Sequence, residues 1–560
     1  MSEGRAEEND LGVLENIRHK LNYKKVEGYS LDEQQVSCIE NDTMNTLVVA
    51  GAGTGKTTTI IGKIKWILKN WFSKRQLAQK STEPPPKVLV ISFTHASKEE
   101  LERRILSEIL QDDLVFKIYH PGDFVEVETF HSLALRMVKG LNFENFKLEV
   151  SGFEGFLKNV MASTTATDAP DLILTEEKAE RFSHLYSLLQ NYNVSISSLQ
   201  KLVRERFRYF WQQDELQKLR ASLLKLTKYT REYQESLKST GSVDFAGLLE
   251  LAKTSLDTNF SYDYVIIDEY QDISPLEYLL IKKLREIHDF KLFCVGDDWQ
   301  TIYQFAGSEI SLILNFEKCW GETNVFKIER TYRFPEKLAE LSGSFIMQNR
   351  AQLVKQIRGK RLDEPDQIVE INGPSERTDL NALYYFLLSL PMHAKIFLIG
   401  RYNFDIRKIS HCEYLTVESY EDKFLITMRE RPDIQFDFMS AHKSKGLQAD
   451  YVFIINCRDT TLGFPSRVEE DKLAGLVREL AILKLSNNKD TGGRFQFLRD
   501  FLWRRKPNDS DFAFSEERRL FYVAMTRARK KVLFLTVKDK ESPFILELRE
   551  NSDLKTYFLD

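Results

Sequence analysis

The chain has 560 residues, of which 42% are hydrophobic and 29% are charged, with a formal net charge of −4. This length is too great for one hydrophobic core and predicts roughly three or four structural units. Its five cysteines are widely spaced without a Cys-x-x-Cys pair, which argues against a zinc site or disulfide framework and favours a reducing cytoplasm. The polar segment 1–10 does not resemble a signal peptide, and no apolar run is long enough to span a membrane. We therefore expect a cytoplasmic protein with no membrane partner, while the small net charge neither requires nor excludes nucleic acid.

Short apolar runs alternate with helical patterns along the chain, which is typical of a mostly parallel α/β sheet. Each run has the length of a strand and ends in polar residues, where ligands bind on open sheets. The runs form two sets, which predicts two α/β domains in tandem. The first set is 46–49, 88–92, 264–267 and 292–295, and the second set is 396–399, 451–455 and 532–536.

Two segments interrupt these sets of strands. Residues 140–240 carry a charged helical pattern and predict an inserted, mostly helical subdomain, and residues of about 459–514 predict a loop-rich insertion that contains Asn487–Gly493. The first domain is therefore expected over 1–139 and 241–316, and the second over 317–560. A further segment, 73–87, holds three prolines in a row and predicts an exposed loop. The basic and aromatic stretch Arg204–Trp211 suits a phosphate-tracking surface, but a charge-rich amphipathic helix is the favoured interpretation.

A glycine-rich loop follows the first predicted strand and precedes a predicted helix, which is the context that a phosphate-binding loop requires. Its backbone N–H groups can surround phosphates, with Lys56 directed to the β- and γ-phosphates and the Thr57 hydroxyl to Mg²⁺. The candidate nucleotide-binding residues are Ala50, Gly51, Ala52, Gly53, Thr54, Gly55, Lys56, Thr57 and Thr58.

A pair of acidic residues, Asp268 and Glu269, ends the predicted strand at 264–267. A carboxylate at this place can hold Mg²⁺, and its neighbour can activate the attacking water. Acids at strand ends are common, but the upstream glycine loop makes a catalytic role the better interpretation. We predict that Asp268 binds the metal together with Thr57 and that Glu269 is catalytic, with ATP and Mg²⁺ as cofactors.

A series of motif-like blocks follows one order along the chain. The blocks are Leu31–Gln35, the glycine loop, Ser92–His95, Thr129–His131, Val243–Phe245, Asp268–Asp272, Val295–Tyr303, Thr331–Phe334, His442–Asp450 and Glu516–Arg529. Together they resemble superfamily-1 DNA helicases of the UvrD/Rep type, and the segments Gly296–Gln300, Thr331–Phe334 and Gly446–Asp450 have the variants typical of the helicase IV branch.

This resemblance implies two tandem RecA-like P-loop domains and an ATP-dependent DNA helicase or translocase with 3′→5′ polarity. It implies that Gln300 senses the γ-phosphate and that Arg333 and Arg527 are arginine fingers carried by the second domain. Gln35 and Tyr332 would bind the adenine base, and Gln448 would lie near the ribose. Such arginines contribute ~10³–10⁵ in rate in related phosphoryl-transfer enzymes. As isolated residues they would be interpreted as solvated surface charges.

The resemblance also implies a single-stranded or tailed duplex DNA partner. Aromatic side chains beyond strand ends can stack on bases in any sequence, although a lone aromatic there is usually part of a core and a lone histidine is usually structural. The candidate DNA-binding residues are Phe93, Thr94, His131, Tyr303, Phe305 and His442.

The sequence departs from UvrD-like relatives at four places. At one of them, Gln448 stands where many relatives have glutamate near the ribose, although helicase IV relatives share the glutamine. Ala306 stands where relatives usually carry arginine, and the region before Gln35 is shorter than in helicase IV. The stretch from Arg333 to His442 is too short for the large regulatory insertion of UvrD and Rep, which is expected to be reduced or absent. An alternative is therefore a translocase that unwinds only with a nuclease or another repair or phage-defence partner. A scaffold without turnover is disfavoured by the intact catalytic residues.

Overall fold

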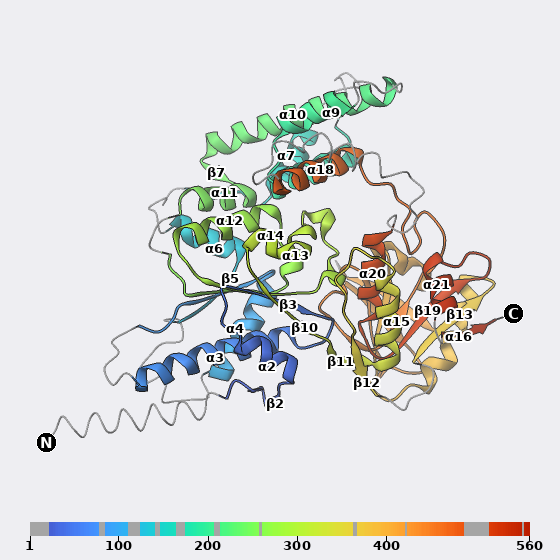
Figure 1. The fold of residues 1–560 in the computed structure, drawn as a ribbon. Helices are drawn as coiled ribbons and strands as arrows, with labels where there is room; N and C mark the ends of the chain where they lie inside the picture. Colours follow the sequence, from blue (N-terminus) through green and yellow to red (C-terminus); the bar gives the residue numbers. More distant parts are fainter. Residues whose placement is uncertain are drawn as a thin grey trace.

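The structure of this chain is a computed structural model in which two helix-covered sheets stand side by side under a helical layer (Figure 1). None of the helices in its described part is long and apolar enough to cross a membrane. The described residues are 22–77, 84–109, 124–139, 146–163, 174–206, 213–256, 260–361, 367–410, 412–420, 423–486, 514–551 and 554–559.

The first sheet has six parallel strands in the order β10-β3-β9-β8-β4-β5. Its central strands are almost wholly buried and rich in valine and isoleucine, as expected where both faces of a parallel sheet are covered. The strands are β3 (Asn45–Ala50), β4 (Val88–Ser92), β5 (Val125–Thr129), β8 (Tyr264–Ile267), β9 (Lys291–Gly296) and β10 (Asn324–Ile328).

Helices cover both faces of this sheet and bury one apolar cluster against each. One cluster unites α2, α3 and α4 with the sheet, and the other unites α6, α11 and α12 with it. These helices are α2 (Glu33–Glu40), α3 (Lys56–Leu77), α4 (His95–Ile109), α6 (Phe130–Lys139), α11 (Phe245–Thr254) and α12 (Pro275–Ile287). Short elements at the rim are η2 (Tyr270–Asp272), η3 (Asp298–Gln300), η4 (Gln304–Ala306), α13 (Ser311–Leu314) and α14 (Phe316–Trp320), with β1 (Lys25–Val26) paired to β2 (Tyr29–Ser30).

The second sheet has eight strands in the order β15-β16-β17-β14-β18-β19-β13-β20, antiparallel only along β15, β16 and β17. Its strands are β13 (Ile368–Gly373), β14 (Lys395–Gly400), β15 (Leu415–Tyr420), β16 (Lys423–Met428), β17 (Gln435–Ser440), β18 (Ala449–Ile454), β19 (Ala528–Val537) and β20 (Lys555–Phe558). The associated helices are α15 (Glu336–Met347), α16 (Glu376–Ser389), η5 (Asn403–Asp405), α17 (Ile406–Ile409), α20 (Ser515–Met525) and α21 (Pro543–Asn551), and β11 (Arg330–Pro335) pairs with β12 (Arg358–Lys360).

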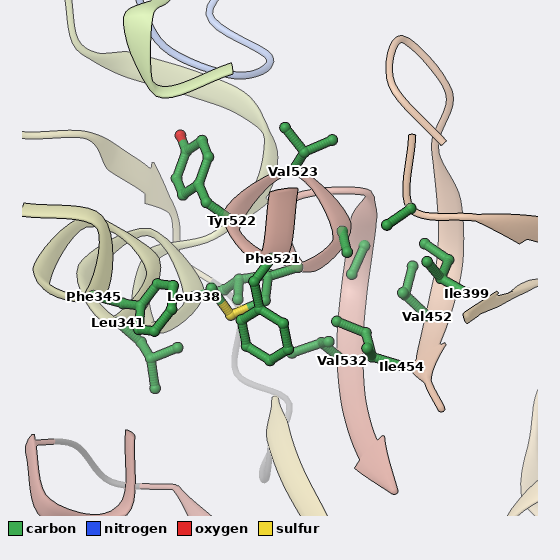
Figure 2. Packing of buried hydrophobic residues seen from close by; sticks show 14 of the residues in the cluster. Leu338, Leu341, Phe345, Ile399, Val452, Ile454, Phe521, Tyr522, Val523 and Val532 are labelled. Atoms are coloured by element: carbon green, nitrogen blue, oxygen red, sulfur yellow. The ribbon is translucent and has the colours of Figure 1, made fainter. Parts of the chain in front are cut away.

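Helix α20 lies at the centre of the second domain's core. Figure 2 shows Phe521 packed towards Phe345 and Leu338 of α15, while the sheet contributes Val452 and its neighbours on the other side. Tyr522 of the same helix packs on Trp299 of the first domain, with ring centroids 5.5 Å apart. The same apolar cluster includes Ala52, Trp299 and Ile302 of the first domain, so the two domains share buried surface beside the glycine loop.

The predicted α/β fold with two parallel sheets is confirmed, and all seven predicted strands exist. One boundary differs: β10 pairs with β3 in the first sheet, although the sequence analysis ended that domain at residue 316. This strand is at the sheet edge and half exposed, so it lacks the continuous apolar pattern that marks the central strands. The described residues between 334 and 441 build the second sheet and its helices, without a separate inserted domain among them.

The helical subdomain comprises α7 (Gly152–Ser163), α8 (Glu176–Asn191), α9 (Ile196–Arg206) and α10 (Gln213–Thr240), above a short β6–β7 pair at 147–148 and 242–243. A fifth helix, α18 (Lys472–Ser486), completes its core although it belongs to the insertion of the second domain. Figure 1 shows α18 beside this group and away from the second sheet. The buried α18 residues in this core are Leu473, Ala474, Leu476, Val477 and Ala481.

Two sequence expectations are corrected by these helices. The insertion after residue 459 is not wholly loop-rich, because α18 is a continuous helix with an apolar face. The exposed spacer begins later than residue 73, because α3 continues to Leu77. The stretch Asn487–Gly493, most of Arg204–Trp211 and the segment 1–10 lie outside the described residues.

Candidate functional site

The glycine loop joins β3 to α3 at the carboxyl edge of the first sheet. Gly53 and Gly55 have positive φ angles of 71° and 85°, a conformation that side chains with a Cβ adopt only with strain. The Thr54 hydroxyl donates to the Gly51 carbonyl over 2.9 Å and closes the turn. Lys56 then begins the helix, so that several backbone N–H groups and the helix N-terminus converge on one place, as anion binding requires.

The second domain approaches this loop through β11. The Thr331 hydroxyl donates to the Ala52 carbonyl over 2.8 Å, and the Tyr332 N–H donates to the Gly53 carbonyl over 2.9 Å. A Cβ on Gly53 would lie 2.5 Å from the Cβ of Arg333. Glycine is therefore required here for two reasons, its backbone conformation and the close approach of the other domain.

Asp268 and Glu269 follow β8, two strands away from β3 in the same sheet. The Lys56 ammonium donates to Glu269 Oε2 over 2.7 Å, and Gln271 Nε2 donates to the same oxygen over 2.6 Å. Burial and the Glu269 charge raise the pKa of Asp268 to about 7. Burial alone would raise the pKa of Glu269, but Lys56 and Lys445 outweigh it and lower this pKa to about 2.

This charge distribution fits a divalent cation and a polyphosphate. The pKa of Asp268 is raised because its carboxylate is buried beside Glu269 with insufficient positive charge, and a Mg²⁺ ion would supply that charge. Thr57 stands in the first turn of α3 and offers a hydroxyl, the ligand that P-loops give to Mg²⁺. When bound, Mg²⁺ would neutralise charge on the transferred phosphate.

Gln35 and Tyr332 lie on the side of the loop where the base is expected. The Gln35 amide donates to the Thr54 carbonyl over 3.3 Å and accepts from the Asp32 N–H over 3.0 Å. Its side chain is buried and engaged by its own chain, so its recognition of adenine stays a prediction. The Tyr332 ring is 40% exposed, with its hydroxyl donating to Asp32 over 2.9 Å, which leaves a surface that a base could stack on. Gln448 is half-buried.

Both predicted arginine fingers converge on Thr526. Arg527 is fully buried; its guanidinium donates to the Thr526 hydroxyl over 3.1 Å and to the Val523 carbonyl over 2.8 Å. Arg333 donates to the Thr526 carbonyl over 3.4 Å. Burial lowers the pKa of Arg333, and burial together with the Arg333 charge lowers the pKa of Arg527. The second domain thus presents Arg333 to the glycine loop and Arg527 to Gln300 as desolvated cations, a charge that the phosphates of a nucleotide would complement.

Gln300 is held by both domains. Its Nε2 donates to Asp297 over 2.5 Å, and its Oε1 accepts from Arg527 over 3.3 Å. Lys445, which follows β17 in the second domain, donates to the Gln300 carbonyl over 2.8 Å and pairs with Asp272 over 2.5 Å. The Lys445 ammonium also lies 4.8 Å from the centre of the Tyr303 ring. One side chain therefore contacts the acidic motif, the predicted sensor and an aromatic residue.

Four rings predicted to bind DNA form a continuous row that crosses from the first domain to the second. Phe93 stacks on Tyr303 with a centroid separation of 6.1 Å and an interplanar angle of 10°. Phe305 contacts Tyr303 at 6.1 Å and His442 at 5.1 Å, in both cases edge to face. Phe305 remains 43% exposed. We name Phe93, Tyr303, Phe305 and His442 the aromatic row.

The remaining predicted DNA residues lie outside this row. His131 contacts Phe245 at 5.2 Å, and burial with the His95 charge lowers its pKa. The Thr94 hydroxyl accepts from the Ser97 N–H over 3.1 Å at the start of α4. Thr94 thus follows Phe93 of the aromatic row directly in the chain, whereas the ring contact of His131 is with Phe245.

The helical subdomain contacts the backbone of the first domain at Ala306 and at the residue before it. Asn191 donates to the Ala306 carbonyl over 2.8 Å, and His184 lies 2.8 Å from the Phe305 carbonyl. These contacts fix the turn that carries Phe305. Helix α8 therefore holds the backbone of an inner member of the aromatic row.

Sequence reasoning missed three cations in the contact between the domains. Lys445 was within a matched block without an assigned role, Lys355 was not singled out, and Arg519, which donates to the Thr301 carbonyl over 2.6 Å, was inside another block. These three residues are identified by a buried charge beside acidic or backbone partners. Burial and such contacts are properties of the tertiary structure. A lysine or arginine in a sequence is most often a solvated surface residue.

Comparisons with known proteins agree with this geometry. Residues 31–320 match the UvrD/REP helicase N-terminal domain family, and residues 413–540 match the UvrD-like helicase C-terminal domain family.

The chain is 28% identical to DNA helicase IV of Escherichia coli over 95% of this chain and 72% of that protein. It is 26% identical to a probable DNA helicase II homolog of Mycoplasma capricolum and 25% identical to the ATP-dependent DNA helicase PcrA of Bacillus subtilis. It spans 42% and 40% of those two relatives, and they match 58% and 57% of this chain. The chain therefore belongs to the UvrD/REP helicase family, whose members are ATP-hydrolysing enzymes that act on DNA.

Proposed function

We propose that this protein is an ATP-dependent helicase or translocase that moves 3′→5′ on single-stranded DNA. ATP and Mg²⁺ would bind between the glycine loop and β11, and DNA would lie along the aromatic row. The polarity comes from the family resemblance. The coupling between the two sites rests on the contacts of one side chain, Lys445.

Lys445 is the observation that carries this proposal. It contacts Asp272 and Gln300 beside the nucleotide site, and its ammonium lies over the Tyr303 ring of the aromatic row. Because Lys445 belongs to the second domain and all three partners belong to the first, movement between the domains must change these contacts together. Nucleotide-driven closure would therefore be transmitted directly to the surface that holds a base.

The pair formed by Lys56 and Glu269 suggests how hydrolysis depends on bound nucleotide. Lys56 donates to Glu269, and the low pKa makes Glu269 a poor base. The γ-phosphate would draw Lys56 away and leave the Glu269 carboxylate to orient and activate water. Arg333 and Arg527 would then stabilise the charge of the transferred phosphate.

Stepping would use the stacking of bases on the aromatic row. Each base that stacks on an aromatic side chain contributes ~1–3 kcal/mol without regard to sequence. Closure of the two domains would shift Phe93 and His442 relative to each other, since they stand on different sheets. A base held at one end of the row could therefore be released while another is captured.

The decisive experiment measures ATP hydrolysis and strand separation on 3′-tailed and 5′-tailed duplexes side by side. We expect DNA-stimulated hydrolysis and unwinding of the 3′-tailed duplex. Lys56→Ala and Glu269→Gln should abolish hydrolysis in a folded protein. Unwinding only of the 5′-tailed duplex would overturn the polarity, and unchanged turnover in either folded variant would overturn the assignment of the site.

A second candidate function is translocation that separates strands only within a complex. It is favoured by the described residues between 334 and 441, which form the second sheet and no additional domain. A nuclease, or another repair or phage-defence protein, would then supply the missing element. The purified chain would in this case hydrolyse ATP on single-stranded DNA and leave the tailed duplex intact.

A further inference from the structure

A buried ion cluster lies beside Gln300 and shares Asp297 with it. The Lys355 ammonium pairs with Asp297 and, over 2.6 Å, with Asp298, and the side chains of all three are fully buried. The same ammonium lies 4.4 Å from the centre of the Trp299 ring. A buried lysine between two carboxylates is uncommon, because each charge loses its hydration.

Lys355 reaches this position from the far side of the domain boundary. It stands between α15 and β12, whereas Asp297–Trp299 follow β9 of the first sheet. Two further bonds join the same segments: the Leu353 N–H donates to Asp298 over 2.7 Å, and Trp299 Nε1 donates to the Leu353 carbonyl over 3.0 Å. The segment that carries Lys355 is thus fixed to the turn that carries Gln300.

Asp297 connects the ion cluster to the catalytic residues. One of its carboxylate oxygens pairs with Lys355 and the other accepts from Gln300 Nε2 over 2.5 Å. Its backbone N–H donates to Gln271 Oε1 over 2.8 Å, and Gln271 in turn donates to Glu269 over 2.6 Å. An unbroken series of contacts therefore runs from Lys355 through Asp297 to both the predicted sensor and the predicted base.

We propose that Lys355 is a positioning residue for ATP hydrolysis. By fixing the Asp297 carboxylate, Lys355 holds the Gln300 side chain in the orientation in which it faces the γ-phosphate. This inference rests on the proposed function, because it assigns Lys355 to the same site. Without the ammonium, the Asp297 oxygen that it contacts would retain only the Trp299 N–H among its described partners, over 3.2 Å, and the acceptor that orients the Gln300 amide would be held less firmly. Lys355 itself stays out of contact with the nucleotide.

The role predicts a specific kinetic signature. Binding of ATP depends on the glycine loop and on Tyr332, which Lys355 does not contact, whereas hydrolysis depends on Gln300. In Lys355→Met we expect kcat for DNA-stimulated hydrolysis to fall about tenfold or more while KM for ATP changes less than about threefold. A parallel fall in Gln300→Ala, with little additional effect in the double variant, would show that Lys355 acts through Gln300.

Two controls separate positioning from folding. Removal of Lys355 leaves two buried carboxylates unpaired, so Lys355→Met is compared with Lys355→Met/Asp298→Asn, which keeps the net charge of the cluster. Lys65→Met removes another buried lysine, paired with Glu108 over 2.8 Å and remote from the domain boundary, and should leave kcat unchanged. Thermal unfolding of each variant verifies the fold.

The outcomes are distinct. Wild-type kcat in a folded Lys355→Met or in its charge-matched double variant would overturn the inference. Effects of Lys355→Met and Gln300→Ala that simply multiply would also overturn it, because independent residues give additive free energies. Wild-type hydrolysis in Gln300→Ala would instead overturn the sensor role in the proposed function.

Discussion

The Arg527 guanidinium donates to the side-chain oxygen of Gln300 over 3.3 Å. Arg527 immediately precedes β19 of the second domain, and Gln300 is in η3 of the first domain. This bond therefore joins the predicted arginine finger to the predicted γ-phosphate sensor. Both side chains are buried. Separation of the two domains would break this bond, so we expect it to form only where the domains approach each other as closely as they do here.

Loss of this guanidinium should remove most of the catalytic rate. We expect Arg527→Ala to reduce kcat for DNA-stimulated ATP hydrolysis by ~10³-fold or more, because a finger stabilises charge that develops in the transition state. Steady-state phosphate release measures this effect. Arg529→Ala is the matched control, since Arg529 lies two residues further along the chain, in β19, and is exposed. Equal rates for the two variants would contradict the finger assignment.

Removal of rings from the aromatic row should weaken DNA binding. Phe93→Ala and Tyr303→Ala should each lower affinity for single-stranded DNA by ~1–3 kcal/mol, the contribution of one stacked base. Fluorescence anisotropy with a labelled oligonucleotide measures the loss. Phe404→Ala is a suitable comparison because Phe404 is 42% exposed and lies outside the row. If Phe404→Ala weakened binding as much as Phe93→Ala, the row would not be the specific DNA surface.

Truncation of buried α18 side chains should destabilise the helical subdomain. This subdomain is inserted in the first domain, whereas α18 belongs to the second. Leu473 is fully buried in that core, and Leu473→Ala should lower the free energy of unfolding by about 2–5 kcal/mol. Hydrogen exchange should increase in α8 and α9, which α18 packs against. Val468→Ala, on the exposed segment before α18, should have little effect. Faster exchange confined to α18 would show that the helix does not support this core.

The pH dependence of stability should include a contribution from His442. Burial, with the Arg401 and Lys445 charges, lowers the pKa of His442 from 6.5 to about 4. Between these values the unfolded chain binds the proton and the folded chain does not, so this group makes the folded state more stable as pH rises from 4 to 6.5. In His442→Gln this part of the slope should disappear, as measured by chemical denaturation across that range. An unchanged slope would contradict the lowered pKa.

Much of the fold could be predicted because its signals are local. The central strands are continuous apolar runs, and each was predicted within a few residues, as with β4 and β8. The glycine loop, Asp268 and Glu269 are likewise contiguous motifs whose chemistry depends on residue type and spacing. By contrast, β10 is a half-exposed edge strand, and α18 resembles any amphipathic helix until its partner is known.

The sequence by itself determined the chemistry of the site: a phosphate loop, an acidic pair, two arginines and several aromatic residues. The tertiary structure alone decided how these parts are connected, because the connections join residues far apart in the chain. Lys445 meets Asp272, Lys355 meets Asp297, and α18 enters a core formed by another domain's insertion. Such contacts depend on burial and on the approach of two domains, which no local pattern of residues records.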